Sequence, residues 1–119
     1  MREVPPGLSA EDARSWQLNA AALVAAADAW ERWGPKIRAN LATMRRACPS
    51  AGAALDRLEA LVGDGPAALA AAMLAATAEG QVLRSCSPLA GILPEAERQR
   101  VLRATRRVGT EAAPREGMA

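Results

Sequence analysis

The chain has 119 residues, half of them apolar, and its 15 basic and 13 acidic residues leave a formal net charge of +2. This length predicts one domain, and the charge is too small to indicate a class of partner. The sequence contains no histidine, which excludes histidine-based zinc sites and serine–histidine pairs. We therefore predict no metal site and no cofactor.

Composition points to an all-α fold. About a quarter of the residues are alanine, and phenylalanine and tyrosine are absent. Alanine, leucine, arginine and glutamate favour helix, whereas the β-branched residues that favour strands are scarce. Because alanine buries little area, we expect oligomerisation or a partner to support the core.

The first predicted elements are an arm and a long helix. Residues 1–8 contain two prolines and a glycine, which predict an extended arm. Ser9 then predicts the cap of a helix over residues 10–33, with Asp12 completing a capping box.

An apolar stripe runs through this helix and beyond it. Steps of four and three residues connect ten positions without a charge, which are Trp16, Ala20, Leu23, Ala27, Trp30, Gly34, Ile37, Leu41, Met44 and Cys48. Large and mostly small members alternate, which is typical of a surface that another helix approaches closely. Gly34-Pro35 lies inside the stripe and indicates either a kink or a turn. That choice decides whether the stripe faces its own chain or another copy.

Two further helices are predicted in the middle of the chain. Pro49-Ser50 begins a helix over residues 51–62, and Gly65-Pro66 begins another over residues 66–84. The glycines before Pro66 favour a plain turn over an anion site. The buried face predicted for the second helix consists of Leu69, Met73, Ala76, Gly80 and Leu83.

The last elements are a loop, a helix and a tail. Residues 85–93 predict a loop whose apolar side chains pack against the bundle, and Pro94 begins a helix over residues 95–108. Residues 109–119 have little to bury and predict a disordered tail. We therefore expect one helical domain over residues 1–108. The apolar loop residues are Leu89, Ile92 and Leu93.

Cysteine spacing and hydropathy bear on location. Cys48 and Cys86 lack metal-like spacing, and we interpret them as buried thiols rather than a disulfide. The first residues lack the apolar core of a signal peptide, and the alanine-rich run 67–78 is too short to span a bilayer. We therefore expect a cytoplasmic protein without membrane contact.

Arginines gather in the second half of the stripe and in the last predicted helix. Arg100, Arg103 and Arg107 follow at spacings of three and four, so they share a helix face suited to phosphate contacts. The alternative is a solvated face that Glu95 and Glu97 balance. The candidate nucleic-acid contacts are Arg45, Arg46, Arg100, Arg103, Arg106 and Arg107.

The stripe also supplies the candidate surface for oligomers or partners. Its tryptophans are the side chains that most often anchor interfaces and cores. Trp33 lies outside the register and either widens the apolar face or stays exposed for a partner. The candidate interface residues are Trp16, Leu23, Trp30, Trp33, Ile37, Leu41 and Met44.

A catalytic alternative rests on arginine and carboxylate side chains. Asp28, Glu31, Arg32 and Arg38 lie close together in the sequence. Asp28 and Arg32 are also spaced as an ordinary i,i+4 pair on an exposed helix face. We therefore predict that the chain is not an enzyme.

The N-terminal third resembles one group of phage terminase small subunits, in which a proline-containing arm and a Leu-Ser cap lead into a helix with an early tryptophan and a later aromatic beside an arginine. The matching positions are Pro5, Pro6, Leu8, Ser9, Trp16, Leu23, Trp30, Arg32 and Trp33. Gene transfer agents derived from phages carry such proteins too.

The resemblance implies a non-enzymatic, ring-forming homo-oligomer that presents double-stranded DNA to a large terminase subunit, an ATPase. Because the sequence shows no helix-turn-helix before the arm, we expect contact mainly with backbone phosphates. The alternative is a protein-binding adaptor or regulatory module without a nucleic-acid role.

Overall fold

The computed structural model describes residues 3–105, which form helices and no strand. This confirms the all-α class. A further helix, termed the final helix, begins at Glu95 and includes Thr105, the last described residue. The predicted end of that helix at residue 108 and the tail 109–119 lie outside the described residues. The other elements are α1 (Ala10–Asp28), α2 (Trp30–Ala47), a 3-10 turn η1 (Pro49–Ala51), α3 (Gly52–Asp64), α4 (Pro66–Met73) and α5 (Ala78–Ser85).

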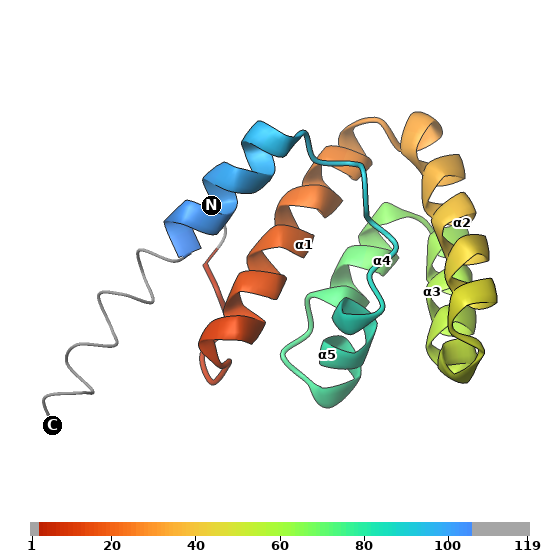
Figure 1. The fold of residues 1–119 in the computed structure, drawn as a ribbon, viewed down its shortest axis with the longest axis horizontal. Coiled ribbons are helices and arrows are strands. Elements are labelled where there is room, and N and C mark those ends of the chain that lie inside the picture. Colours follow the sequence, from red (N-terminus) through yellow and green to blue (C-terminus); the bar gives the residue numbers. More distant parts are fainter. Residues whose placement is uncertain (1–2, 106–119) are drawn as a thin grey trace, which may run out of the picture.

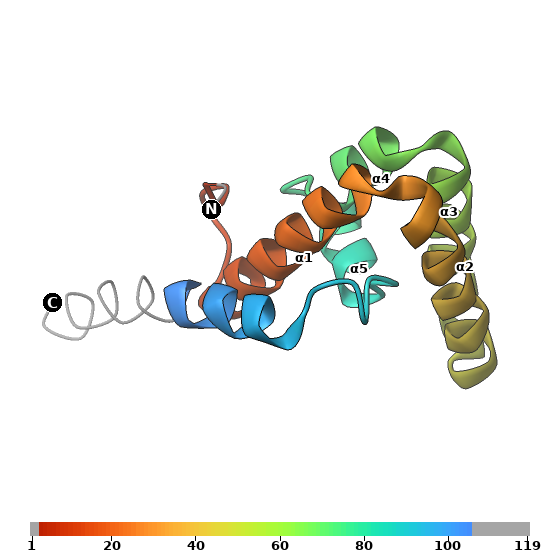
Figure 2. The same cartoon turned by 90° about the horizontal axis from the view of Figure 1, so that it is seen from above.

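The helices form two arms around a central helix. α1 and α2 meet at one end of the molecule, α3 runs beside α2, and α4 lies between this pair and α1 (Figure 1). Two views at right angles both place the final helix beside α1 (Figure 2). The final helix therefore lies at the outer edge of the bundle.

Helix α1 begins where the sequence predicts. Ser9 Oγ accepts a hydrogen bond from the backbone N–H of Asp12 at 3.1 Å, which satisfies one free donor of the first turn. The Asp12 carboxylate accepts from Gln81 Nε2 at 3.2 Å, so its contact ties α1 to α5. The capping prediction therefore holds for Ser9, while Asp12 links two helices.

The helix that carries the stripe is interrupted at Ala29 and not at Gly34-Pro35. The predictions of a kink or a turn at Gly34-Pro35 are therefore both wrong. Ala29 has φ −141° and ψ 55°, and its N–H bonds to Ala26 O at 3.2 Å. α2 starts immediately afterwards and continues through Pro35. Because the proline lies near the start of α2, it removes a single early helix bond. No residue near Ala29 is a helix breaker, so packing rather than local propensity determines the bend.

A single hydrophobic core joins all the labelled α-helices and the loop before the final helix. Its large members are fully or almost fully buried. Burial of apolar area is the main favourable term in folding, so this cluster holds the fold together. The core side chains from α1 to α5 include Leu23, Ile37, Leu41, Leu55, Leu58, Leu69, Met73 and Leu83.

The predicted turn before Pro66 is confirmed. Gly65 has φ +112°, a conformation that glycine adopts without steric cost, and Pro66 takes the first position of α4. α3 spans Gly52–Asp64, close to the predicted 51–62.

The predicted single helix over residues 66–84 is wrong. α4 ends at Met73, α5 begins at Ala78, and the two meet at 113°. Thr77 caps α5, because its Oγ1 accepts from the Gly80 N–H at 3.1 Å. Of the predicted buried face, only Ala76 is exposed.

The loop over residues 86–94, termed the strap, packs onto the bundle as predicted. Leu89 and Ile92 are buried in the core, and Leu93 is half-buried. Asn40 Nδ2 on α2 donates to the carbonyls of Pro88 at 2.8 Å and Ala90 at 3.0 Å. Both apolar and polar contacts therefore fix the strap that leads to the final helix.

The cysteines are free, as predicted, but burial was predicted wrongly for one of them. Cys48 is exposed, while Cys86 is half-buried beside the core.

The lengths and hydropathy of the helices over residues 3–105 bear on membrane insertion. No single helix in this range is long and apolar enough to cross a membrane. Helices α4 and α5 have the required length and composition only when they are taken together, as a pair bent by 113°.

Candidate functional site

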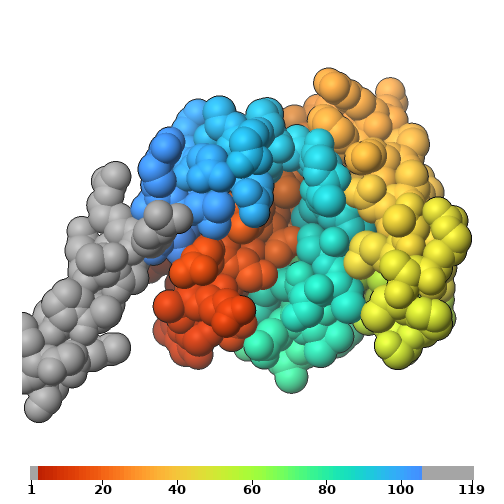
Figure 3. All heavy atoms as spheres, viewed as in Figure 1, coloured from red at the N-terminus to blue at the C-terminus, as the bar shows by residue number. Residues whose placement is uncertain are grey.

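A hollow with polar and apolar lining, termed the polar pocket, lies between α1, the strap and the final helix. It has a volume of about 350 Å³. In the space-filling view, α1 is visible at the bottom of a depression between the final helix and the strap (Figure 3). Its apolar lining comes from Leu18, Ala22, Leu89 and Leu93, and its polar side chains are Asn19, Ser87 and Arg98.

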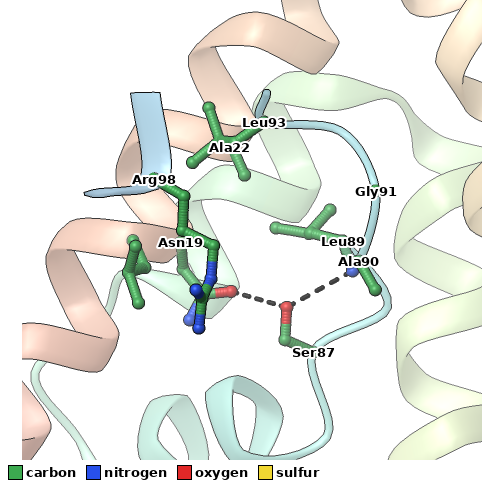
Figure 4. Close-up of a pocket in the computed structure, with 9 residues that line it drawn as sticks. Asn19, Ala22, Ser87, Leu89, Ala90, Gly91, Leu93 and Arg98 are labelled. Carbon is green, nitrogen blue, oxygen red and sulfur yellow. Dashed lines mark hydrogen bonds between the residues drawn. The ribbon is translucent and has the colours of Figure 1, made fainter. Parts of the chain in front are cut away.

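Hydrogen bonds fix one wall of the polar pocket. Ser87 Oγ donates to Asn19 Oδ1 at 2.6 Å, and the Leu89 N–H donates to Ser87 Oγ at 3.4 Å (Figure 4). Asn19 Nδ2 also donates to Ser15 O at 2.8 Å, and only 7% of Asn19 is exposed. A buried polar network with satisfied partners is rigid, so this wall is preorganised.

Arg98 supplies the positive charge of the polar pocket. Its side chain extends from the final helix toward Asn19 (Figure 4). Glu95 lies one turn earlier, with 3.6 Å between Arg98 Nη1 and Glu95 Oε1, and half of the arginine side chain is exposed. Such an exposed, long ion pair is weak, so the guanidinium retains donors for another anion.

A second hollow, termed the apolar groove, lies beside the polar pocket between α1 and the start of the final helix. It measures about 380 Å³, and its lining is mostly apolar. Val24 lies in it with 51% of its surface exposed, and Leu93 separates it from the polar pocket by lining both. Asp28 and Glu97 place carboxylates on its lining.

The candidate interface residues divide into two groups. Trp16, Leu23, Ile37 and Leu41 are at most 4% exposed inside the chain's own core. An interface role for these four is incompatible with this fold, because their surfaces are already covered. The remaining three are half-buried against the core, namely Trp30, Trp33 and Met44.

The candidate nucleic-acid contacts on α2 differ from each other. Arg45 bridges α2 to α3 through Asp56 at 2.7 Å and through Glu59. The hydrogen bonds that Arg45 donates to the carboxylates of Asp56 and Glu59 raise the pKa of Arg45 above its ordinary value. Arg46 is exposed and donates to Thr43 Oγ1 at 3.4 Å. Arg45 therefore serves the fold, whereas Arg46 faces solvent.

The final helix carries the other candidate nucleic-acid contacts. Arg100 pairs with Glu97 at 2.7 Å while 69% of its side chain is exposed, and Arg103 is exposed as well. Arg106 and Arg107 lie outside the described residues. The sequence placed Arg98 in this basic cluster but did not identify it as a site residue.

The side chains considered for catalysis do not gather into a pocket. Asp28, Glu31, Arg32 and Arg38 are all exposed, and the bend at Ala29 assigns Asp28 and Arg32 to different helices. The prediction of an i,i+4 pair is therefore wrong. The Arg32 guanidinium instead lies 4.6 Å from the Trp33 ring centroid, a cation–π contact. Over residues 3–105, no group of three or more His, Cys, Asp or Glu side chains could hold a metal ion.

Sequence reasoning missed Asn19 and Ser87. A signal was present, because Asn19 lies beside Ala20 of the stripe and one turn from Trp16, where a polar side chain on a buried face needs a partner. Its partner is Ser87, which lies 68 positions along the chain, and only the folded strap brings the two together.

Comparisons of the chain with protein-family models, with curated proteins and with solved structures found no match. The resemblance to terminase small subunits therefore stays a prediction.

Proposed function

We propose that this chain is a non-enzymatic, oligomeric protein that contacts the backbone of double-stranded DNA through its final helix. Its role would be that of a terminase small subunit, which delivers DNA to an ATPase large subunit. The observation that supports this most is the position of the final helix. Val101 packs inward with 5% exposure, while Arg98, Arg100 and Arg103 all face outward.

The ion pairs on this helix leave its arginines usable. Arg98 and Arg100 pair with glutamates one turn earlier, and every partner in these pairs is at least 43% exposed. Exposed pairs of this kind contribute about 0 to 1 kcal/mol. Because the cost of breaking them is small, phosphates can replace the glutamates as partners.

Self-association in this proposal uses a different surface from the stripe. Trp16, Leu23, Ile37 and Leu41 of the stripe lie in the core. The apolar groove on α1 is open and contains Val24. Sedimentation velocity measures the state directly, and a strict monomer at all concentrations would contradict the oligomeric part of the proposal.

The DNA contact is tested by fluorescence anisotropy with a labelled duplex over a range of salt concentrations. We expect binding without strong sequence preference, and affinity that falls as salt rises. Replacing Arg100, Arg103, Arg106 and Arg107 with glutamine should weaken binding and reduce the salt slope by about 1 for each lost phosphate contact.

Arg45→Gln is the matched control, because Arg45 is committed to Asp56 and Glu59 across the α2–α3 pair. It removes one positive charge from the same protein without touching the final helix. DNA affinity that survives the quadruple substitution, or that falls equally in the control, would contradict the proposal.

The alternative function is a protein-binding adaptor without a nucleic-acid role. The apolar groove favours it, because a half-exposed valine beside alanines is a surface suited to a partner's apolar side chains. A chain without salt-dependent affinity for duplex DNA would support this alternative over the first.

A further inference from the structure

The polar pocket combines a cation, a fixed polar wall and an apolar lining. We propose that it binds a small aliphatic carboxylate, with the Arg98 guanidinium as the anion-binding group. Arg98 belongs to the same basic helix as the proposed DNA contact, but the two proposals can be tested apart, because Arg98 lines the hollow and the DNA test leaves Arg98 in place.

The chemistry of Arg98 favours a carboxylate. A guanidinium presents paired N–H donors in a plane, which matches the two oxygens of a carboxylate. Glu95 already lies 3.6 Å from Arg98 and offsets part of its charge. A site with one partly balanced cation suits a monoanion better than a doubly charged phosphate.

The rest of the lining sets the size and character of the ligand. The volume of about 350 Å³ lies at the small end of ligand sites. Leu18, Ala22 and Leu89 surround the space with aliphatic surface. A branched chain of a few carbons fits this space and would remove apolar area from water.

The fixed wall determines orientation. Asn19 and Ser87 use each other as partners at 2.6 Å, so their positions do not depend on a ligand. Asn19 Oδ1 keeps one lone pair that can accept from a ligand donor. Because an ionised carboxylate has no donor for this oxygen, it binds the Arg98 guanidinium instead, and the hydrocarbon chain faces the leucines.

Two sources supply this chemistry: a free short-chain acid, and the C-terminal carboxylate of a peptide that ends in leucine. The experiment titrates isotopically labelled protein by NMR with isocaproate, with its neutral amide isocaproamide, and with a short leucine-terminated peptide. Saturable shifts of the amides of residues 18–22, 87 and 89–91 are expected with the acid, the peptide or both, and not with isocaproamide.

Binding of the free acid identifies a small-molecule site, and binding of the peptide alone identifies a peptide terminus as the ligand. Either result supports the proposal. Failure of both carboxylates to bind, or equal binding of isocaproamide, would overturn it.

Variants separate Arg98 from general positive charge. Arg98→Ala should raise the dissociation constant at least about tenfold, because it removes a charge-assisted pair. Arg103→Ala is the matched control, since Arg103 lies on the same exposed helix and outside the pocket lining. Equal effects of the two variants would overturn the assignment of Arg98. Leu93→Ala should also weaken binding, since Leu93 contributes apolar lining.

Discussion

The α4–α5 corner and the α2–α3 hairpin both reverse the chain, but different interactions hold them. The hairpin encloses large aliphatic side chains such as Ile37 and Leu55, and its polar ties are exposed ion pairs from Arg45. The corner is rich in alanine, and side chains stabilise it through buried or part-buried hydrogen bonds to its backbone carbonyls.

The corner depends on a buried arginine. Arg84 is 4% exposed, and its Nη1 donates to Met73 O and Ala75 O, both at 2.8 Å. Met73 is the last residue of α4, and the C-terminal end of a helix favours a positive charge. Burial lowers the pKa of Arg84 from its ordinary value, because loss of water disfavours the charged form. The α4–α5 corner, which is rich in small residues, therefore depends on a few polar contacts. The α2–α3 hairpin, which has large side chains, is stabilised by many apolar contacts.

Gly80→Ala should break the corner most severely. A Cβ there would lie 2.1 Å from Ala75 O and 3.0 Å from Ala75 C, and no side-chain rotation can relieve a clash with backbone. We expect a loss of about 3 kcal/mol or more in urea unfolding followed by circular dichroism.

Gly63→Ala in α3 is the control for that change, because a Cβ at Gly63 meets nothing within 4 Å. It should leave stability unchanged or raise it by up to about 1 kcal/mol. Similar losses in both variants would show that the corner is not a tightly packed region.

Arg84→Met should cause the next largest loss, about 2 to 3 kcal/mol, because it leaves two carbonyls at the corner without their donor. Arg57→Met makes the same change at an exposed arginine that pairs with Glu79 at 3.4 Å. That variant should lose less than about 1 kcal/mol. Equal losses in urea denaturation would remove the distinction between buried and exposed arginines.

Trp16→Phe should cost about 1 to 2 kcal/mol. The tryptophan Nε1–H donates to Leu74 O at 2.9 Å just after α4, and phenylalanine keeps most of the apolar contact but no donor. A midpoint of thermal unfolding equal to that of the wild type would show that this bond adds nothing to the corner.

Arg45→Gln should have the smallest effect on folding. It removes exposed ion pairs that join α2 to α3, while the aliphatic contacts of the hairpin remain. The wild type should show the same small loss when salt screens these pairs. A loss in chemical denaturation as large as that of Arg84→Met would contradict the proposed division between the two regions.

The sequence predicted those parts of the fold that carry strong local signals. Ser9 and Gly65-Pro66 were identified correctly, because capping and left-handed turns need particular residue types. Thr77 carried a capping signal too, but the continuous alanine run around it indicated one helix. The direction of the corner depends on Arg84, which contacts the carbonyls at the corner from α5, and on Trp16, which contacts the corner from α1.

Long-range packing also determines that the stripe packs against its own chain. Its register was right for Leu23 and Leu41, which are buried, yet the bend at Ala29 has no local cause. Only with both helices folded onto α3 and α4 does the stripe meet its own chain. The polar pocket was missed for the same reason, since the strap brings Ser87 to Asn19.

The buried members of the stripe, Trp16, Leu23, Ile37 and Leu41, are covered within one chain. Acrylamide quenching of Trp16, as the sole tryptophan in a Trp30→Phe, Trp33→Phe variant, tests this most directly. Trp16 should stay protected, with a quenching constant that does not change over about a hundredfold dilution. A quenching constant that rises on dilution toward that of free tryptophan would show that another copy covers the stripe, and would contradict the account.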